Sequence, residues 1–309
     1  MAKVLITGGT GLLGKALTDR LLMSGHEVVL LSRTARPSAI KGVSVFAWDI
    51  HKKIIDPAAL NGVEYVVHLA GSGIADHRWT DAVKQEAVSS RVDSMKLLEQ
   101  AIRERGIRLK AFTGGAAIGY YGMITSSKVF SETDPPATDD FLVQCCRAWE
   151  ASYAGMSALA DKCCVIRIGV VLSKEGGALK RMLPVFRWGL GSPLGTGEQY
   201  MPWIHINDLV EILFHSLFRE NMQGTYNAAA PVVVTNREFS KQLAAILQKP
   251  FFAPPVPGFI IRAMYGEMGN VVLKGSAVSV QRLLDSGFKF RFPELQMALK
   301  YELNKGSEL

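Results

Sequence analysis

Short apolar runs alternate with helix-periodic segments along the first part of the chain. The apolar runs cover residues 4–7, 28–31, 43–48, 65–70, 109–113 and 164–171, and the helix-periodic segments cover residues 11–24, 80–105 and 141–159. Such alternation is typical of a parallel sheet whose strands are joined by helical crossovers. The pattern therefore predicts an α/β protein with a doubly wound, Rossmann-type sheet, which binds ligands at the carboxyl ends of its strands.

The pattern loosens after residue 171. Residues 176–177 and 189–197 are predicted to be loops, 208–219 a helix, 224–229 a short strand, 250–257 a proline-rich linker, and the last helix opens at 292–295. We therefore expect a dinucleotide-binding Rossmann domain over residues 1–171, to which segments near 202–248 return. Residues 172–201 and 249–309 are expected to form a smaller C-terminal lobe that covers the substrate.

A glycine-rich loop joins the first predicted strand to the first predicted helix. Gly8, Gly11 and Gly14 follow the spacing G-x-x-G-x-x-G, with Leu12 and Leu13 between the last two. At a strand-to-helix junction the first glycine permits a tight turn, the second lets the backbone approach a pyrophosphate, and the third lets helix pack on strand. Free N–H groups at the helix start favour the phosphates. The loop predicts a dinucleotide site, although a purely structural turn is the alternative.

The residues after the second strand indicate which dinucleotide is bound. An NAD site usually has a carboxylate there for the ribose hydroxyls, whereas an NADP site needs a cation for the 2′-phosphate. This chain has Ser32 and Arg33, and no acid between Glu27 and Asp49. A guanidinium binds phosphate through two parallel hydrogen bonds, so NADP(H) is favoured over NAD(H). Asp49 and Ile50, just past the third strand, are placed to border the adenine.

Composition and charge narrow the functional classes further. The chain has 309 residues, 48% of them hydrophobic, and a formal charge of +7. No apolar run reaches the roughly 18 residues of a membrane helix, and no basic run is interleaved with aromatics as in nucleic-acid binders. The four cysteines form two adjacent pairs without metal-ligand spacing. We expect a cytoplasmic protein with reduced thiols, no metal site, and neither nucleic acid nor membrane as a partner.

Several segments in order resemble the extended short-chain dehydrogenases/reductases. These are the loop at 7–14, the HLAG sequence at 68–71, RIGVVL at 167–172, PWIHIND at 202–208 and GTYN at 224–227. Other segments resemble more specifically the atypical, YfcH-like NAD(P)-dependent epimerase/dehydratase group. They are RW at 78–79, SR at 90–91, GYYG at 119–122, WE at 149–150, GGA at 176–178, RLL at 282–284, GF at 287–288 and FPEL at 292–295.

The resemblance implies an NADP(H)-binding Rossmann fold with a C-terminal substrate lobe. It implies that Arg91, on the long helix, reaches the cofactor phosphates, whereas the residue type alone fits a solvated helix position equally well. It also places the HLAG segment (68–71) and the RIGVVL segment (167–172) beside the cofactor. The residues so implied are Leu69, Ala70, Gly71, Arg167 and Val171. A long helix before the fifth strand packs against its copy in family dimers, so a homodimer is one expected arrangement.

The usual catalytic residues of this family are missing. Short-chain dehydrogenases use a Tyr and a Lys four residues apart on one helix, where the Lys lowers the pKa of the Tyr. The matching positions here hold Leu142 and Cys146, and GGAA at 114–117 supplies no serine hydroxyl. Substitute acid/base groups are Tyr120, Tyr121 and Glu150, with Arg147 as a substitute cation. A tyrosine pair is more often pocket wall than catalyst, and His205 is expected to cap the helix that follows it.

Two functions are therefore open on the sequence. In the first, the protein is an epimerase-, dehydratase- or reductase-like oxidoreductase that acts with NADP(H) on a small, nucleotide-linked substrate. In the second, it binds NADP(H) without turnover, as a sensor or scaffold. The missing Tyr-x-x-x-Lys pair favours the second function, and the resemblance favours the first.

Overall fold

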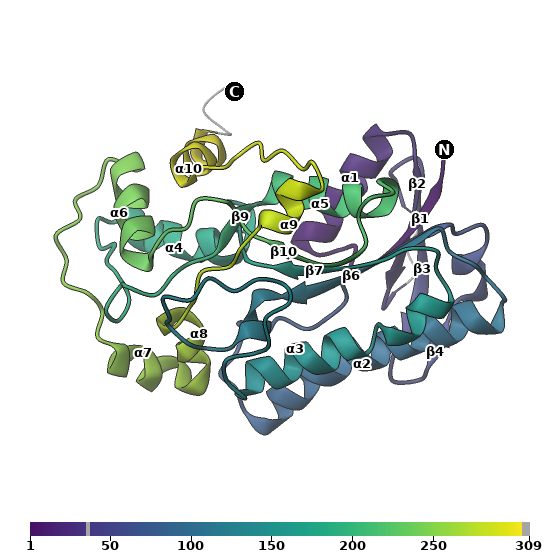
Figure 1. The fold of residues 1–309 in the computed structure, drawn as a ribbon, viewed down its shortest axis with the longest axis horizontal. Helices are drawn as coiled ribbons and strands as arrows, with labels where there is room; N and C mark the ends of the chain where they lie inside the picture. Colours follow the sequence, from purple (N-terminus) through teal and green to yellow (C-terminus); the bar gives the residue numbers. More distant parts are fainter. Residues whose placement is uncertain (35–37, 305–309) are drawn as a thin grey trace.

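An eight-stranded sheet forms the centre of the computed structural model, which describes residues 1–34 and 38–304 (Figure 1). The strand order is β10-β7-β6-β5-β1-β2-β3-β4, and every pairing is parallel except that between β3 and β4. Its strands are β1 Lys3–Thr7, β2 Glu27–Ser32, β3 Val43–Asp49, β4 Ile54–Ile55, β5 Tyr65–His68, β6 Ala111–Ala117, β7 Cys163–Ile168 and β10 Gly224–Ala228. The expected doubly wound, Rossmann-type sheet is confirmed.

Helices cover both faces of this sheet. Alternate residues of one strand separate into two cores: Val4 packs with α1 and α5 on one face, whereas Leu5 packs with α2 and α3 on the other. Because successive side chains of a strand point to opposite faces, each strand contributes apolar residues to both cores. Figure 1 shows α2 and α3 along one face, with α1 and α5 across the sheet from them. These helices are α1 Leu12–Met23, α2 Asp81–Glu104, α3 Phe141–Ala151 and α5 Ile206–Phe218.

The expected strand at 164–171 is wrong as a single element, because the chain divides at Gly169. A Cβ on Gly169 would lie 2.5 Å from the carbonyl oxygen of Pro202, so the backbone of another segment crosses closely there. Beyond this point β8 (Val170–Ser173) leaves the large sheet and pairs with β9 (Trp203–His205). The expected strand at 109–113 is also misplaced, since β6 runs from Ala111 to Ala117.

Two helix expectations are corrected as well. The predicted helix 141–159 ends at Ala151 and is followed by a short 3-10 turn, η3 (Ala154–Ala158). Residues 176–177 were expected to be a loop, yet Gly177 is the first residue of α4 (Gly177–Arg187). Gly177 has φ +66°, a conformation that glycine adopts readily, so a glycine pair here starts a helix.

A second core packs against the small β8–β9 sheet at the C-terminal side of the molecule, and we refer to it as the lobe. It includes α6 (Asn236–Ile246), which lies within the range 202–248 that was expected to return to the Rossmann domain. Its core joins α4, α6 and α10 to Leu172 and Trp203, and Figure 1 shows these helices at the end of the molecule away from β2 and β3. The remaining elements are α6 Asn236–Ile246, α7 Gly258–Tyr265, α8 Asn270–Leu273, α9 Gln281–Asp285, α10 Leu295–Asn304 and the 3-10 turns η1 Pro57–Leu60, η2 Ile118–Tyr121 and η4 Gly266–Gly269.

Buried polar contacts fasten this lobe to the sheet. His205 caps α5, as expected, by accepting from the N–H of Asn207 through Nδ1 (3.1 Å). Its Nε2 therefore carries the hydrogen, and it lies 3.0 Å from Oε1 of Glu302 on α10. Asp208 accepts from the N–H groups of Arg291 and Phe292, each at 2.9 Å. Burial raises the pKa of Asp208, which these two hydrogen bonds oppose.

Candidate functional site

The carboxyl ends of β1 and β5 lie side by side where the strand order reverses. Such a switch point is where open α/β sheets bind their ligands. A buried hydrogen-bond chain fixes the two ends: the Thr7 hydroxyl accepts from the N–H groups of Leu69 and Ala70 (3.1 Å each) and lies 2.9 Å from Nδ1 of His68. Nε2 of His68 lies 3.2 Å from the Ser94 hydroxyl on α2.

These hydrogen bonds hold His68 as a neutral imidazole. Its Nδ1 accepts from Thr7, whose oxygen already accepts two N–H groups, and its Nε2 donates to Ser94, which passes its own hydrogen to the carbonyl of Arg91 (3.0 Å). Complete burial lowers the pKa of His68 to about 3. Neither Thr7 nor Ser94 was recognised from the sequence, and only the threonine at the strand end could have indicated this network.

Two glycines of the loop have no room for a side chain. A Cβ on Gly8 would lie 2.7 Å from the carbonyl oxygen of Leu69, and one on Gly14 would lie 2.5 Å from that of Gly8. Gly8 also has φ +70°. Gly11 is the N-cap of α1, and no side chain caps this helix start. The N–H groups of the first turn therefore stay available for an anion, as the pyrophosphate of a dinucleotide requires.

The strand ends beside the loop hold the residues predicted to select the dinucleotide. Arg33 is exposed directly after β2, and Ser32 is half-buried at the strand's last position. Asp49 ends β3 and accepts from the N–H of Lys52 at 3.0 Å, a hydrogen bond that lowers the pKa of its carboxyl group. Ile50 packs partly against the α2-side core. Leu12 and Leu13 are partly buried against the α1-side core, as is Val171 on β8.

Arg91 is buried, so the solvated-helix interpretation of this residue is wrong. Its guanidinium donates to the carbonyls of Ala87 (2.8 Å) and Ser72 (2.9 Å) and lies 4.6 Å from the ring centre of Trp149. A Cβ on Gly71 would lie 2.9 Å from its Cζ, which explains a glycine there. Its Nε is buried and has no hydrogen-bond partner among the described residues, so a donor beside the β5 end remains unused.

Arg167 lies at the centre of a buried polar cluster at the end of β7. Its Nε and Nη2 donate to the two Glu150 oxygens at 2.7 and 2.8 Å, and its Nη1 donates to the Tyr121 hydroxyl at 3.0 Å. The guanidinium also stacks 3.5 Å over the Tyr120 ring. Burial opposes the charge of Arg167, yet the Glu150 carboxylate raises its pKa. Glu150, on α3, is thereby committed to an ion pair with Arg167.

Tyr121 is part of the same cluster. It is buried, stacks on Phe130, and donates its hydroxyl to Oδ1 of Asn227 at 2.7 Å. Burial raises the pKa of Tyr121, although Arg167 opposes the rise. Tyr120 is only half-buried. Of the three predicted acid/base groups, Tyr120 is therefore the one whose described contacts leave its hydroxyl uncommitted.

We expect Tyr121→Phe to lower stability and leave cofactor affinity unchanged. The substitution removes an acceptor from Arg167 and a donor from Asn227 inside a buried cluster, which costs about 1–3 kcal/mol. Urea unfolding and a nicotinamide titration measure the two quantities. Tyr120→Phe, which keeps the ring under Arg167, is the matched control and should be nearly neutral. Unchanged stability of Tyr121→Phe would contradict the structural role.

The two helix positions of the family's usual Tyr and Lys are closed by packing. Leu142 and Cys146 are buried with Trp79 and Met268, which come from the segment before α2 and from η4. Burial raises the pKa of the Cys146 thiol. Arg147, the expected substitute cation, is exposed and so does not join Arg167. The sequence indicated the missing pair, but not the distant residues that fill its place.

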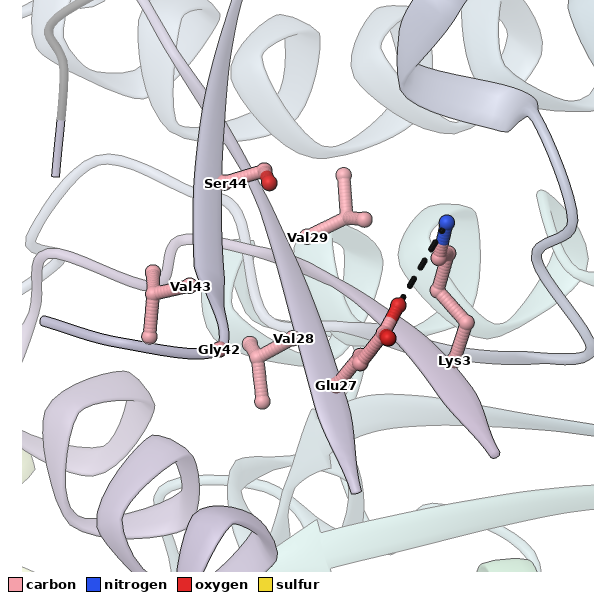
Figure 2. A pocket seen from close by; sticks show the side chains of 7 residues that line it. All are labelled: Lys3, Glu27, Val28, Val29, Gly42, Val43 and Ser44. Atoms are coloured by element: carbon pink, nitrogen blue, oxygen red, sulfur yellow. Dashed lines mark ion pairs between the residues drawn. The ribbon is translucent and has the colours of Figure 1, made fainter. Parts of the chain in front are cut away.

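A shallow hollow of about 230 Å³ lies at the opposite ends of the strands (Figure 2). It is lined where β1, β2 and β3 begin, and its charged groups, Lys3 and Glu27, pair with each other at 3.5 Å. This hollow is remote from the glycine loop and has no converging functional groups.

Within residues 1–34 and 38–304, no cluster of His, Cys, Asp and Glu could hold a metal ion, and no helix there is long and apolar enough to cross a membrane.

Residues 4–229 match the NAD dependent epimerase/dehydratase family, and residues 256–302 match a domain of unknown function, DUF1731. The mouse epimerase family protein SDR39U1 is 38% identical over 301 residues, which are 96% of this chain and 98% of that protein. The crystal structure of human SDR39U1 (isoform 2) with NADPH superposes with a TM-score of 0.86 at 34% identity, covering 99% and 100% of the two chains. A nucleoside-diphosphate sugar epimerase from Corynebacterium glutamicum gives 0.79 at 29% identity, covering 98% of this chain and 58% of its own.

Proposed function

Since the chain belongs to the NAD dependent epimerase/dehydratase family, we propose that it binds NADP(H) across the carboxyl ends of β1, β2 and β5. The cradle at Gly8 and Gly14, in which a Cβ would collide with backbone, carries this proposal. The first-turn N–H groups of α1 would take the pyrophosphate. Arg33 and Ser32 would take the 2′-phosphate, and Arg91 would hold the end of β5 in place beside the cofactor through its hydrogen bond to the Ser72 carbonyl. The NADPH complex of human SDR39U1 supports this choice.

The predicted selectivity resides in Arg33. We expect Arg33→Asp to lower NADPH affinity roughly a hundredfold, about 3 kcal/mol, because a bidentate charged contact is replaced by repulsion. NADH affinity should change little. Nicotinamide fluorescence measures both affinities on protein stripped of cofactor. Lys41→Asp makes the same charge change at an exposed neighbouring position and should have little effect. Equal losses for both variants would contradict a specific 2′-phosphate site.

The reaction we propose is epimerase-, dehydratase- or reductase-like chemistry on a small, nucleotide-linked substrate. NADP(H) supplies a hydride acceptor or donor when bound. Tyr120 is the remaining proton-transfer candidate, because Tyr121 and Glu150 are committed to Arg167. The fit to a nucleoside-diphosphate sugar epimerase supports the substrate class.

One observation favours a second function, in which NADP(H) is bound without turnover. Leu142 and Cys146 fill the usual proton-transfer positions and pack against Trp79 and Met268. A protein with this packing would sense the cofactor or present a cofactor-dependent surface. Protein loaded with NADP⁺ or with NADPH is incubated with nucleoside-diphosphate sugars, and both the sugar and the bound cofactor are followed. An altered sugar, or a change in the redox state of the bound cofactor, would favour the enzyme, and the absence of both would favour this function.

A further inference from the structure

Helix α7 exposes nearly all of its apolar side chains. It has the sequence GFIIRAMY, yet Ile261 is its single buried residue. Phe259 is 70% exposed, and Ile260, Met264 and Tyr265 are exposed as well. A helix with this composition is normally buried, so α7 has an apolar face that the described part of the chain leaves uncovered.

Two neighbouring segments extend this face. Trp188, the residue directly after α4, is 83% exposed, and Phe252 in the connection from α6 to α7 is 82% exposed. The segments that bear them run together, because a Cβ on Gly189 would touch Pro250 at 3.4 Å and Leu194 pairs with Val256. Figure 1 shows the connection and α7 along the outer edge of the lobe, at one end of the long axis. We call Trp188, Phe252 and Phe259 the aromatic tips.

Exposed cations lie in the same stretches of the chain as the aromatic tips. Residues 249–274 contain exposed Lys249, Arg262 and Lys274, and their one acid, Glu267, already pairs with Lys84 at 2.5 Å. Arg187 lies beside Trp188 and is exposed. This edge therefore combines large protruding apolar groups with an excess of positive charge, so its partner must be both apolar and anionic.

The charge and shape together select the occupant. A second copy related by twofold symmetry would bring the same cations against one another, which disfavours self-association. A protein partner would need pockets shaped to fit each of the separated aromatic side chains. A lipid headgroup layer needs no such pockets: it accepts isolated protruding aromatics, and an anionic layer attracts Lys and Arg. We propose that this edge docks the protein reversibly on an anionic membrane surface. The expectation of no membrane partner rested on the lack of a spanning run, which peripheral docking does not require.

Trp188 offers a direct test, because the other four tryptophans, at 48, 79, 149 and 203, are buried. The holoprotein is mixed with vesicles of phosphatidylcholine alone or of phosphatidylcholine with phosphatidylserine. With phosphatidylserine we expect co-sedimentation, a blue shift of the tryptophan emission and protection from an aqueous quencher, all weakened by salt. Vesicles of phosphatidylcholine alone should give none of these changes.

Matched variants separate the surface from the fold. Phe252→Ala with Phe259→Ala should lower the partition coefficient roughly tenfold or more, whereas Met23→Ala with Ile54→Ala, which are also exposed but lie elsewhere, should not. Lys249→Glu with Lys274→Glu should abolish binding, and Lys41→Glu with Lys96→Glu should weaken it far less. NADPH affinity, kept in every variant, reports the fold. Absence of binding to phosphatidylserine vesicles at low salt, equal binding without phosphatidylserine, or a stable dimer that shields Trp188 would each overturn the proposal.

Discussion

Gly14→Ala will abolish measurable NADPH binding while the protein remains folded. The new Cβ would lie 2.5 Å from both the carbonyl oxygen of Gly8 and the Cα of Gly9, both backbone atoms. Helix α1 must therefore move away from the loop, which costs about 1–3 kcal/mol in packing. The same movement displaces the first-turn N–H groups from the phosphates. Losing two such charged hydrogen bonds, at about 1.5–3 kcal/mol each, lowers affinity more than roughly a hundredfold.

Nicotinamide fluorescence and urea unfolding measure the two effects of Gly14→Ala. Gly25→Ala is the matched control, because Gly25 follows the other end of α1 and has open space within 4 Å. Gly25 has φ +76°, so its replacement costs stability through backbone strain without moving the loop. Wild-type NADPH affinity in Gly14→Ala would remove the loop from the binding site.

Glu150→Ala is expected to destabilise the protein by about 3–5 kcal/mol, because it leaves the buried Arg167 guanidinium without its carboxylate. Glu150→Gln retains one acceptor and should lose less. The double variant Glu150→Leu with Arg167→Met removes both charges, so it should recover much of the loss. Urea denaturation of the three variants measures this series.

The same variants distinguish a structural Glu150 from a catalytic one. A catalytic carboxylate would make Glu150→Gln fold like the wild type and lose turnover on an identified substrate. If Glu150 serves only the ion pair, the single variants should lose stability, and the double variant should recover much of that loss. Wild-type stability in Glu150→Ala would contradict the role that the Arg167 geometry assigns.

Local sequence signals identified the features that depend on neighbours in the chain. The glycine loop lies at the junction of β1 and α1, and His205 caps α5 through a residue two positions away. The spacing of apolar runs also predicted the parallel sheet. Each of these depends on a few consecutive residues, whose conformational limits are known in advance.

Features that join distant segments were not predictable in this way. The burial of Arg91 depends on Trp149 and on the carbonyl of Ser72, neither of which is near it in the chain. The break at Gly169 depends on the crossing backbone of Pro202. No periodicity encodes such crossings, because they arise only when the lobe packs on the sheet.

The buried carboxylate of Asp208 has a consequence for protein synthesis. Every strand of the large sheet has been made once the ribosome passes Ala228. The N–H groups that Asp208 requires belong to Arg291 and Phe292, and the carboxylate beside His205 belongs to Glu302. A nascent chain therefore contains every strand of the sheet well before it contains the partners of Asp208 and His205. Until those partners are synthesised, the side chains of Asp208 and His205 lack the cover that buries them in the finished protein.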